Sequence, residues 1–353
     1  MTHFDQQRRS NFLLEAQTSL KAAMPSDVVI RAERLAAIND VYISTGRDPE
    51  LAGAIDMLVD SAATSSTPES NKLRILFVIG ESGSGKSMTI RKHLRDRNEF
   101  QPRMVHGQEI KPMVSFDAPK PSTLKSFCRA AIQAIGYPVY GSMSEAAYIE
   151  LFKQQLVERR VLFLHIDEMQ HVIKNSKPAV IQEIADTVKS ILQIDGWPMH
   201  LILSGVPSLA RFLQGDNQIV NRKMVVRFEQ ILFPRDAELV RTVAHGIVRD
   251  DAQMAMNDLS DEAVHRIIHA ANGAFGTIIQ FVRATVGMVM RQNEDAINSE
   301  SFARTYTAFS GCLPGQNVFL VKNFKDVEPA NALADLLDKY NDSAKMASTG
   351  TQK

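Results

Sequence analysis

The fold is decided by one stretch of the chain, an apolar run, Ile75-Leu76-Phe77-Val78-Ile79, followed directly by Gly80-Glu81-Ser82-Gly83-Ser84-Gly85-Lys86-Ser87. The second part fits the pattern G-x-x-x-x-G-K-[ST], in which backbone amides of a glycine-rich loop surround phosphate groups. The helix that begins at the end of such a loop adds the positive end of its dipole to the same site. A strand, loop and helix in this order predict a P-loop that binds ATP.

Two side chains of this loop have expected roles toward the ligand. Lys86 would neutralise the β- and γ-phosphates, and the hydroxyl of Ser87 would bind Mg²⁺. A glycine-rich turn without a ligand is the alternative, and the apolar run immediately before the loop counts against it. The predicted cofactors are therefore ATP and Mg²⁺.

A second apolar run delivers two carboxylates at its end. The run Val161-Leu162-Phe163-Leu164-His165-Ile166 is followed by Asp167 and Glu168. If this strand lies parallel to the first, Asp167 comes close to the metal held by Ser87, and Glu168 can polarise the attacking water. Acidic residues often follow apolar strands, so this pattern depends on the P-loop upstream for its meaning.

Three further side chains are candidates for the catalytic site. Ser204 follows the apolar run Met199–Leu203, where it would sense the γ-phosphate or orient water, or merely cap a turn. Arg222 and Arg227 lie before another apolar stretch. Either could reach the nucleotide of a neighbouring subunit and stabilise charge on the transferred phosphoryl group, or could be an ordinary surface charge.

The remaining pattern predicts an α/β fold with a central parallel sheet, a helical N-terminal lead-in and a C-terminal helical lid. Strands are expected at about 74–79, 111–116, 161–166 and 199–203, and only helices are expected after Phe233. The predicted regions are a helical N-terminal region at 1–60, a linker at 61–72, an α/β core at 73–233, a helical lid at 234–325, and a C-terminal helix with a flexible tail at 326–353.

Taken together, the P-loop, the Asp167-Glu168 strand end, Ser204, the Arg227-Phe228 pair and the helical tail resemble an AAA+ ATPase. The order of the motifs over about 35–319 is similar to that of the TniB and TnsC-like DNA transposition proteins. This resemblance implies ATP hydrolysis, a homo-oligomer (ring or filament) on double-stranded DNA, and partners that include a transposase and a target-selection protein.

One position departs from the family pattern. The family usually carries an arginine in the lid helix near the glycine that starts it, whereas here Gly276 is followed by Thr277, and Arg283 lies further along. We therefore expect hydrolysis that is slow or that depends on a neighbour's arginine.

Composition limits the possible partners. Lysine and arginine equal aspartate and glutamate at 40 each, so a DNA-binding face must be local. Candidates for contact with the DNA backbone are Lys120, Thr123, Lys125 and Lys174, although all of them could be ordinary loop residues. Without a long apolar run or a secretory signal pattern, no membrane contact and a cytoplasmic location are expected.

Two rival functions remain open. The first is another AAA+ DNA-transaction ATPase, of the origin-initiator or helicase-loader type. No clear winged-helix pattern follows the lid, which counts against an initiator. The second is a signalling switch that binds ATP but seldom hydrolyses it, which Thr277 would allow.

Overall fold

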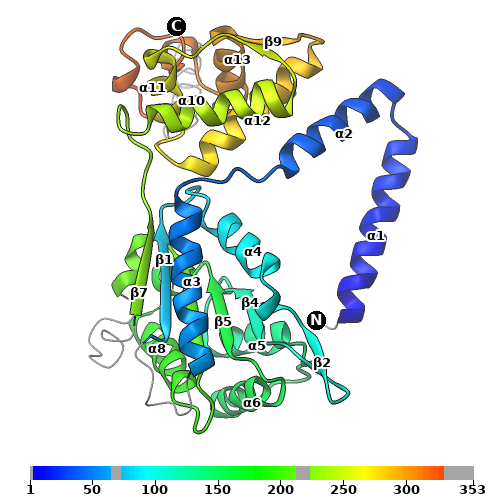
Figure 1. Ribbon diagram of the computed structural model, residues 1–353, viewed down its shortest axis with the longest axis vertical. Helices are drawn as coiled ribbons and strands as arrows, with labels where there is room; N and C mark the ends of the chain where they lie inside the picture. Colours follow the sequence, from blue (N-terminus) through cyan, green and yellow to red (C-terminus); the bar gives the residue numbers. More distant parts are fainter. Residues whose placement is uncertain (1–2, 65–72, 176, 212–222, 330–353) are drawn as a thin grey trace, which may run out of the picture. The chain divides into compact units, whose positions relative to one another are not determined.

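The computed structural model describes residues 3–64, 73–175, 177–211 and 223–329 of the 353-residue chain (Figure 1). The chain divides into two compact units. The first consists of Met1–Leu20 and Ser44–Glu229, and the second of Lys21–Ile43 and Gln230–Lys353. Each unit has its own hydrophobic core.

The first unit is built on a five-stranded sheet with the order β4-β5-β6-β1-β7, in which all neighbours are parallel. Its strands are β1 (Ile75–Gly80), β4 (Met113–Asp117), β5 (Phe163–Asp167), β6 (His200–Gly205) and β7 (Lys223–Phe228). A small antiparallel pair, β2 (Arg103–Val105) with β3 (Gln108–Ile110), lies outside this sheet. Because the strands are parallel, their carboxyl ends meet at one edge, which is where ligands bind in such folds.

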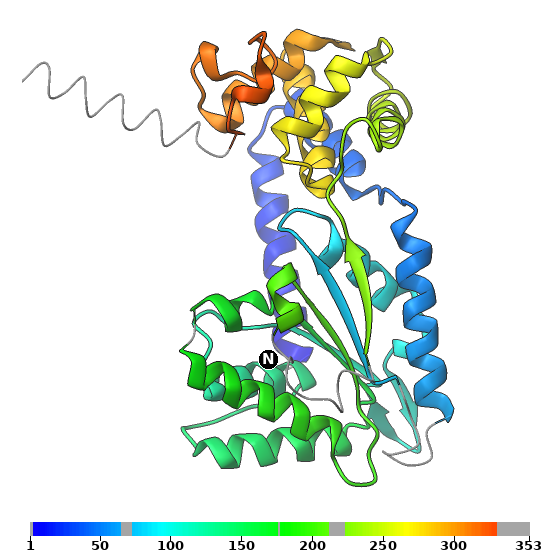
Figure 2. The same cartoon turned by 90° about the vertical axis from the view of Figure 1, so that its left-hand side faces the viewer.

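Helices cover both faces of the sheet (Figure 2). Alternate side chains of β1 enter different cores: Ile75 and Phe77 pack with α5, α6 and α8, whereas Leu76 and Val78 pack with α3 and α4. A strand buried on both faces needs apolar residues at every position, which explains the continuous apolar runs in the sequence. Among the described residues, the α-helices of this unit are α1 (His3–Ala22, which belongs to it up to Leu20), α3 (Arg47–Thr64), α4 (Lys86–Asp96), α5 (Leu124–Ile135), α6 (Glu145–Glu158), α7 (Gln170–Asn175) and α8 (Pro178–Leu192).

The second unit is mainly helical. Its core includes Val264, Ile267 and Ile268 of α11 and Ile278 and Val282 of α12, spaced so that they share one face of each helix. Its elements are α2 (Ser26–Asp40), α10 (Ala237–His245), a π-helical turn (Gly246–Asp251), β8 (Ala255–Met256), α11 (Asp261–Ala270), α12 (Phe275–Arg291), β9 (Ala296–Ile297) and α13 (Ser299–Ser310).

Within the described residues, no single helix is long and apolar enough to cross a membrane. The pair α11 and α12 passes that test only when taken together, and it is bent by 110°.

The predicted α/β fold with a central parallel sheet is confirmed, and the four expected strands are present with bounds shifted by one or two residues. Two expectations need correction. The sheet has a further strand, β7, and the second unit contains the short parallel pair of β8 and β9 besides its helices. The expected C-terminal helix and tail lie largely outside the described residues, as does most of the expected linker.

Candidate functional site

The predicted P-loop connects β1 to α4 at the carboxyl edge of the sheet. Gly85 has a φ of +94°, a conformation that favours glycine and lets the chain turn into α4. Gly80 is fixed by crowding, because a Cβ atom there would lie 2.7 Å from the Cβ of Phe228 and 2.8 Å from the Oγ of Ser84. The loop is further closed by a hydrogen bond from the amide of Ser84 to the carbonyl of Glu81 at 3.2 Å.

Lys86 points back into this loop. Its side chain is buried, and its Nζ donates a hydrogen bond to the carbonyl oxygen of Glu81 at 3.2 Å. Burial lowers the pKa of the Lys86 ammonium group, and the nearby carboxylates of Glu168, Asp167 and Glu81 oppose that effect. A buried cation held by a loop carbonyl is suited to exchange this contact for the oxygens of an anionic ligand.

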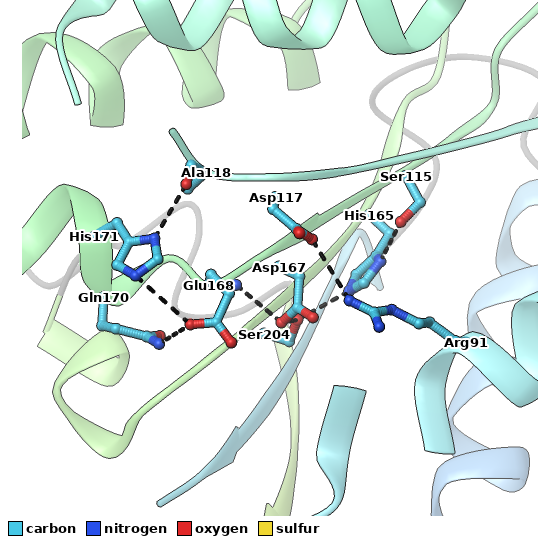
Figure 3. Close-up of polar contacts among 10 residues, drawn as sticks. All are labelled: Arg91, Ser115, Asp117, Ala118, His165, Asp167, Glu168, Gln170, His171 and Ser204. Carbon is cyan, nitrogen blue, oxygen red and sulfur yellow. Dashed lines mark hydrogen bonds and ion pairs between the residues drawn. The ribbon is translucent and has the colours of Figure 1, made fainter. Parts of the chain in front are cut away.

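Asp167 uses its two carboxylate oxygens differently (Figure 3). Its Oδ1 accepts hydrogen bonds from the hydroxyl of Ser204 at 2.6 Å and from the amide of Glu168 at 2.9 Å. Its Oδ2 is buried and has no hydrogen-bond partner among the described residues. Burial alone would raise the pKa of Asp167, but the hydrogen bond from Ser204, the imidazole of His165, the nearby Ser87 hydroxyl and the hydrogen bond from the Glu168 amide hold it below its usual value.

These observations test whether the residues fit Mg²⁺. A buried, charged carboxylate oxygen without a partner is costly unless a ligand completes it. The Ser87 hydroxyl lies close enough to Asp167 to stabilise its charge, and Mg²⁺ prefers oxygen ligands of this kind. Asp167 Oδ2 and Ser87 therefore form a suitable pair of protein groups for this ion.

Glu168 follows directly, with a φ of +56°, an uncommon value for a residue other than glycine. Its Oε2 accepts a hydrogen bond from the side-chain amide nitrogen Nε2 of Gln170 and lies 3.9 Å from Nε2 of His171. His171 in turn contacts the carbonyl of Ala118 through Nδ1 at 3.2 Å. Figure 3 shows Glu168 beside Gln170 and His171, so the turn after β5 aims the carboxylate and a polar pair holds it.

Gln170 was not identified from the sequence as a site residue. It approaches closely because β6 ends in Gly205, where a Cβ atom would lie 2.9 Å from Oε1 of Gln170. In the sequence, this contact is indicated only by the glycine at position 205. The need for glycine there becomes clear once β5 pairs with β6, because Gln170 then packs against it.

Ser204 lies at the predicted edge, next to the P-loop strand in the sheet. Its hydroxyl is buried and hydrogen-bonds to Asp167, as described above. The structure thus gives this hydroxyl a carboxylate partner, a role that the sequence interpretation did not include.

Arg47 is a second residue that the sequence did not reveal. From the start of α3, its Nη1 donates to the carbonyl of Ser84 at 3.3 Å and its Nη2 donates to the carbonyl of Glu229. Its guanidinium carbon lies 5.7 Å from the centre of the Phe228 ring. Arg47 therefore connects the P-loop with the end of β7.

Of the two arginine candidates, only Arg227 lies within the described residues. Arg227 lies near the carboxyl end of β7, opposite Ile79 of β1, and its side chain is exposed. Arg222 lies outside the described residues. The proposed role of either arginine at a neighbouring subunit stays a prediction.

The lysine candidates cluster only in part. Lys120 and Lys125 are exposed and flank the start of α5. Between them, Thr123 caps that helix: its Oγ1 accepts a hydrogen bond from the amide of Ser126 at 3.1 Å. The backbone of Lys174 belongs to α7, and its side chain lies outside the described part of the chain.

Comparison with known proteins agrees with this fold. Residues 71–213 match the family model described as an AAA domain. No match was found among the curated proteins.

Three solved structures of similar fold come from two organisms. Cdc6p from Pyrobaculum aerophilum gives a TM-score of 0.55 at 13% identity, covering 77% of this chain and 70% of that one. The Aeropyrum pernix ORC1 protein in complex with DNA gives 0.53 at 16% identity, covering 76% and 66%. The ORC2 protein of the same organism gives 0.54 at 9% identity, covering 80% and 75%. At such low identity these likenesses establish the fold alone, and the chain has a P-loop AAA+ fold.

Proposed function

We propose that this protein is an ATP-dependent, DNA-binding regulator of DNA transposition that oligomerises on target DNA and recruits or activates a transposase. The observation that carries the ATPase part is the meeting of three groups at one sheet edge. These are the buried ammonium of Lys86, the Oδ2 of Asp167, which has no partner among the described residues, and the carboxylate of Glu168, whose charge opposes the lowering of the Lys86 pKa by burial.

The chemistry of hydrolysis follows from these groups. The P-loop amides and Lys86 would bind the phosphates. Ser87 and Asp167 would hold Mg²⁺, whose positive charge would offset the negative charge of the phosphate oxygens. Glu168 accepts a proton from the water that attacks the γ-phosphorus. The bond between this phosphorus and the β,γ-bridging oxygen breaks, and ADP and phosphate leave.

Binding to DNA is proposed from charge and from the fold. Lys120 and Lys125 are exposed at the start of α5 and can contact phosphates without reading bases. One protein of similar fold, ORC1, was solved in complex with DNA. That observation also favours the rival function, a DNA-transaction ATPase of the initiator type.

Assembly into an oligomer is proposed because hydrolysis in this class uses an arginine from a neighbouring subunit, for which Arg227 is exposed. The first helix supports the idea, since α1 exposes large apolar side chains that a second copy could cover. These are Phe12, Leu13, Leu14 and Leu20.

The transposition part rests on the resemblance in motif order to the TniB and TnsC-like proteins. We would test it by electron microscopy of the protein with duplex DNA and a slowly hydrolysed ATP analogue, with ADP, or without nucleotide. Rings or filaments around DNA that form only with the ATP analogue are expected. Monomers in every sample would contradict the proposal and favour a nucleotide-dependent switch.

The partner that the assembly binds, a transposase or a helicase, distinguishes the proposed function from the initiator or loader function. The analogue-bound assembly should retain a transposase encoded near the same gene in a pull-down assay. Retention of a replicative helicase instead would support the initiator or loader function.

A further inference from the structure

A hydrogen-bonded chain of side chains crosses three strands of the sheet and ends at Asp167 (Figure 3). Ser115 of β4 contacts His165 Nδ1 at 2.8 Å, and His165 Nε2 contacts Ser204 Oγ at 2.9 Å. The Ser204 hydroxyl then donates to Asp167 Oδ1 at 2.6 Å. His165, Ser204 and Asp167 are all buried, whereas Ser115 is exposed on the edge strand.

The charge of Asp167 decides which group donates in each hydrogen bond of this series. An ionised carboxylate only accepts hydrogen bonds, so the single proton of Ser204 goes to Asp167. Ser204 Oγ must then accept from His165 Nε2–H, which leaves His165 Nδ1 as an acceptor for the Ser115 hydroxyl. A neutral imidazole has one donor and one acceptor, and both are used here.

The imidazole occupies a position where an apolar side chain would be the ordinary choice. Its neighbours in β5, Leu164 and Ile166, are fully buried, and His165 itself is 1% exposed. Burial of a polar ring in such a core costs free energy unless its hydrogen bonds are made. Both ring nitrogens of His165 meet this requirement, and one of the two bonds leads to the metal carboxylate.

These hydrogen bonds decide which carboxylate oxygen of Asp167 stays available for a metal ion. Its Oδ1 already accepts from Ser204 and from the Glu168 amide, and its buried Oδ2 accepts from no described residue. Fixing Ser204 on Oδ1 therefore keeps the carboxylate from rotating and presents Oδ2 as the ligand for a metal ion.

We propose that His165 is a positioning residue for the metal site: it orients the Ser204 hydroxyl, which holds Asp167 so that Oδ2 faces the divalent cation. The inference rests on the proposed function, because it assumes that Asp167 binds Mg²⁺ together with a nucleotide. Ser115 completes the arrangement, because its hydroxyl can donate to Nδ1 of the tautomer that Ser204 selects.

The first test needs no metal and no nucleotide. Long-range ¹H–¹⁵N NMR of the histidine-labelled, metal-free protein should show His165 as the Nε2–H tautomer, assigned by loss of its signal in His165→Gln. Ser204→Ala should shift the Nε2 resonance. The Nδ1–H tautomer would overturn the proposal, as would an imidazole resonance that does not respond to Ser204→Ala.

The second test measures metal affinity with Mn²⁺ as the probe, by electron paramagnetic resonance in the presence of ADP. His165→Leu should weaken Mn²⁺ binding about 10-fold or more, as expected when a partner of a metal ligand is lost. ADP affinity without metal should stay unchanged. Unchanged Mn²⁺ affinity in His165→Leu would overturn the proposal.

The matched control is His200→Leu, which removes another fully buried imidazole, from β6, that takes no part in the chain. It should leave Mn²⁺ affinity at the wild-type value, and an equal loss in both variants would reduce the effect to general loosening of the sheet and so count against the proposal. If wild-type protein binds no ADP at all, the proposed function fails, and the NMR result still decides the role of His165.

Discussion

Arg47 donates a hydrogen bond from its Nη1 to the carbonyl oxygen of Ser84 at 3.3 Å, which ties the first residues of α3 to the P-loop. The same guanidinium group reaches the carbonyl of Glu229. Three segments that are distant in the sequence are thus held by one side chain. Lysine cannot make these contacts at once, because its ammonium is a single point rather than a fork.

Arg47→Ala should therefore lower both stability and nucleotide affinity. Loss of hydrogen bonds from a charged group costs about 1.5–3 kcal/mol, and the P-loop loses its tether. Thermal unfolding with and without ADP measures both effects, and Arg47→Lys should recover only part of them. Arg95→Ala, which removes an exposed arginine from α4, is the control. Equal unfolding temperatures of the Arg47 and Arg95 variants, with and without ADP, would contradict this role of Arg47.

Lys86→Ala should reduce ATP affinity at least about tenfold, since charge-assisted contacts to phosphate are among the stronger hydrogen bonds. Isothermal titration calorimetry with ATP would measure the loss. Lys92→Ala is matched to it, because Lys92 lies on the same helix and pairs with Asp96 at the surface. The assignment of the P-loop would be wrong if both variants bound ATP like the wild type.

Glu168→Gln should keep ATP binding and slow hydrolysis by about 10²-fold or more, the usual contribution of a general base. Phosphate release measures the rate, and ATP-bound oligomers should accumulate. Glu183→Gln, at an exposed position of α8, should hydrolyse ATP at the wild-type rate. An unchanged rate in Glu168→Gln would remove this residue from the mechanism.

The stability of the fold should fall on acidification because of buried histidines. Burial, and then the charge of Arg74, lowers the pKa of His200 to about 4 from 6.5, and burial lowers that of His165 to about 4. The unfolded chain therefore takes up protons below about pH 6.5, which the folded chain resists until about pH 4. Stability is complete above this window and is lost as pH falls through it, by about 3 kcal/mol for each histidine.

Urea unfolding between pH 7.5 and pH 5 would measure this dependence. His200→Leu should flatten the part of the curve below about pH 6 by up to about 1.4 kcal/mol per pH unit, the value for one proton. His106→Asn, at an exposed position with a φ of +50° that asparagine accepts, should leave the slope unchanged. A slope that His200→Leu does not alter would show that this residue titrates normally in the fold.

The proposed DNA contacts predict a dependence on salt. Each lysine that binds a phosphate contributes about one unit to the slope of log affinity against log salt concentration. Lys120→Ala and Lys125→Ala should each reduce this slope by about one and weaken binding to all sequences alike. Fluorescence anisotropy with duplex DNA provides the measurement, with Lys322→Ala, at an exposed position of the second unit, as the control. Slopes equal to the wild type would exclude the start of α5 from the interface.

Those parts of the site that are contiguous in sequence were predictable. The P-loop needs glycines, Lys86 and Ser87 at fixed spacing, and Asp167 needs a buried strand before it, so short patterns carry both. The contacts that position them join distant residues. Ser204 lies 37 positions from Asp167, and His165 lies 50 positions from Ser115. No local sequence pattern predicts that either pair is in contact.

Strand β7 was missed for a different reason. Fully buried parallel strands are continuous apolar runs, whereas β7 lies at the edge of the sheet and is apolar mainly at alternate positions. Val226 and Phe228 are buried, and Lys223 and Arg227 are exposed. Its charges drew attention to a possible catalytic arginine, although the alternation itself indicates a half-exposed strand.

The position of β7 also affects how any variant of Arg227 is interpreted. Within the described residues, β7 pairs only with β1, so its other side offers free backbone groups to another chain. Charged side chains on such a strand discourage accidental pairing and aggregation. Replacing Arg227 by alanine would remove one of these protecting charges together with any catalytic role. Self-association of such a variant without nucleotide would therefore indicate pairing between the exposed β7 edges of two copies. The variant Arg227→Lys, which retains the charge, is needed as a control.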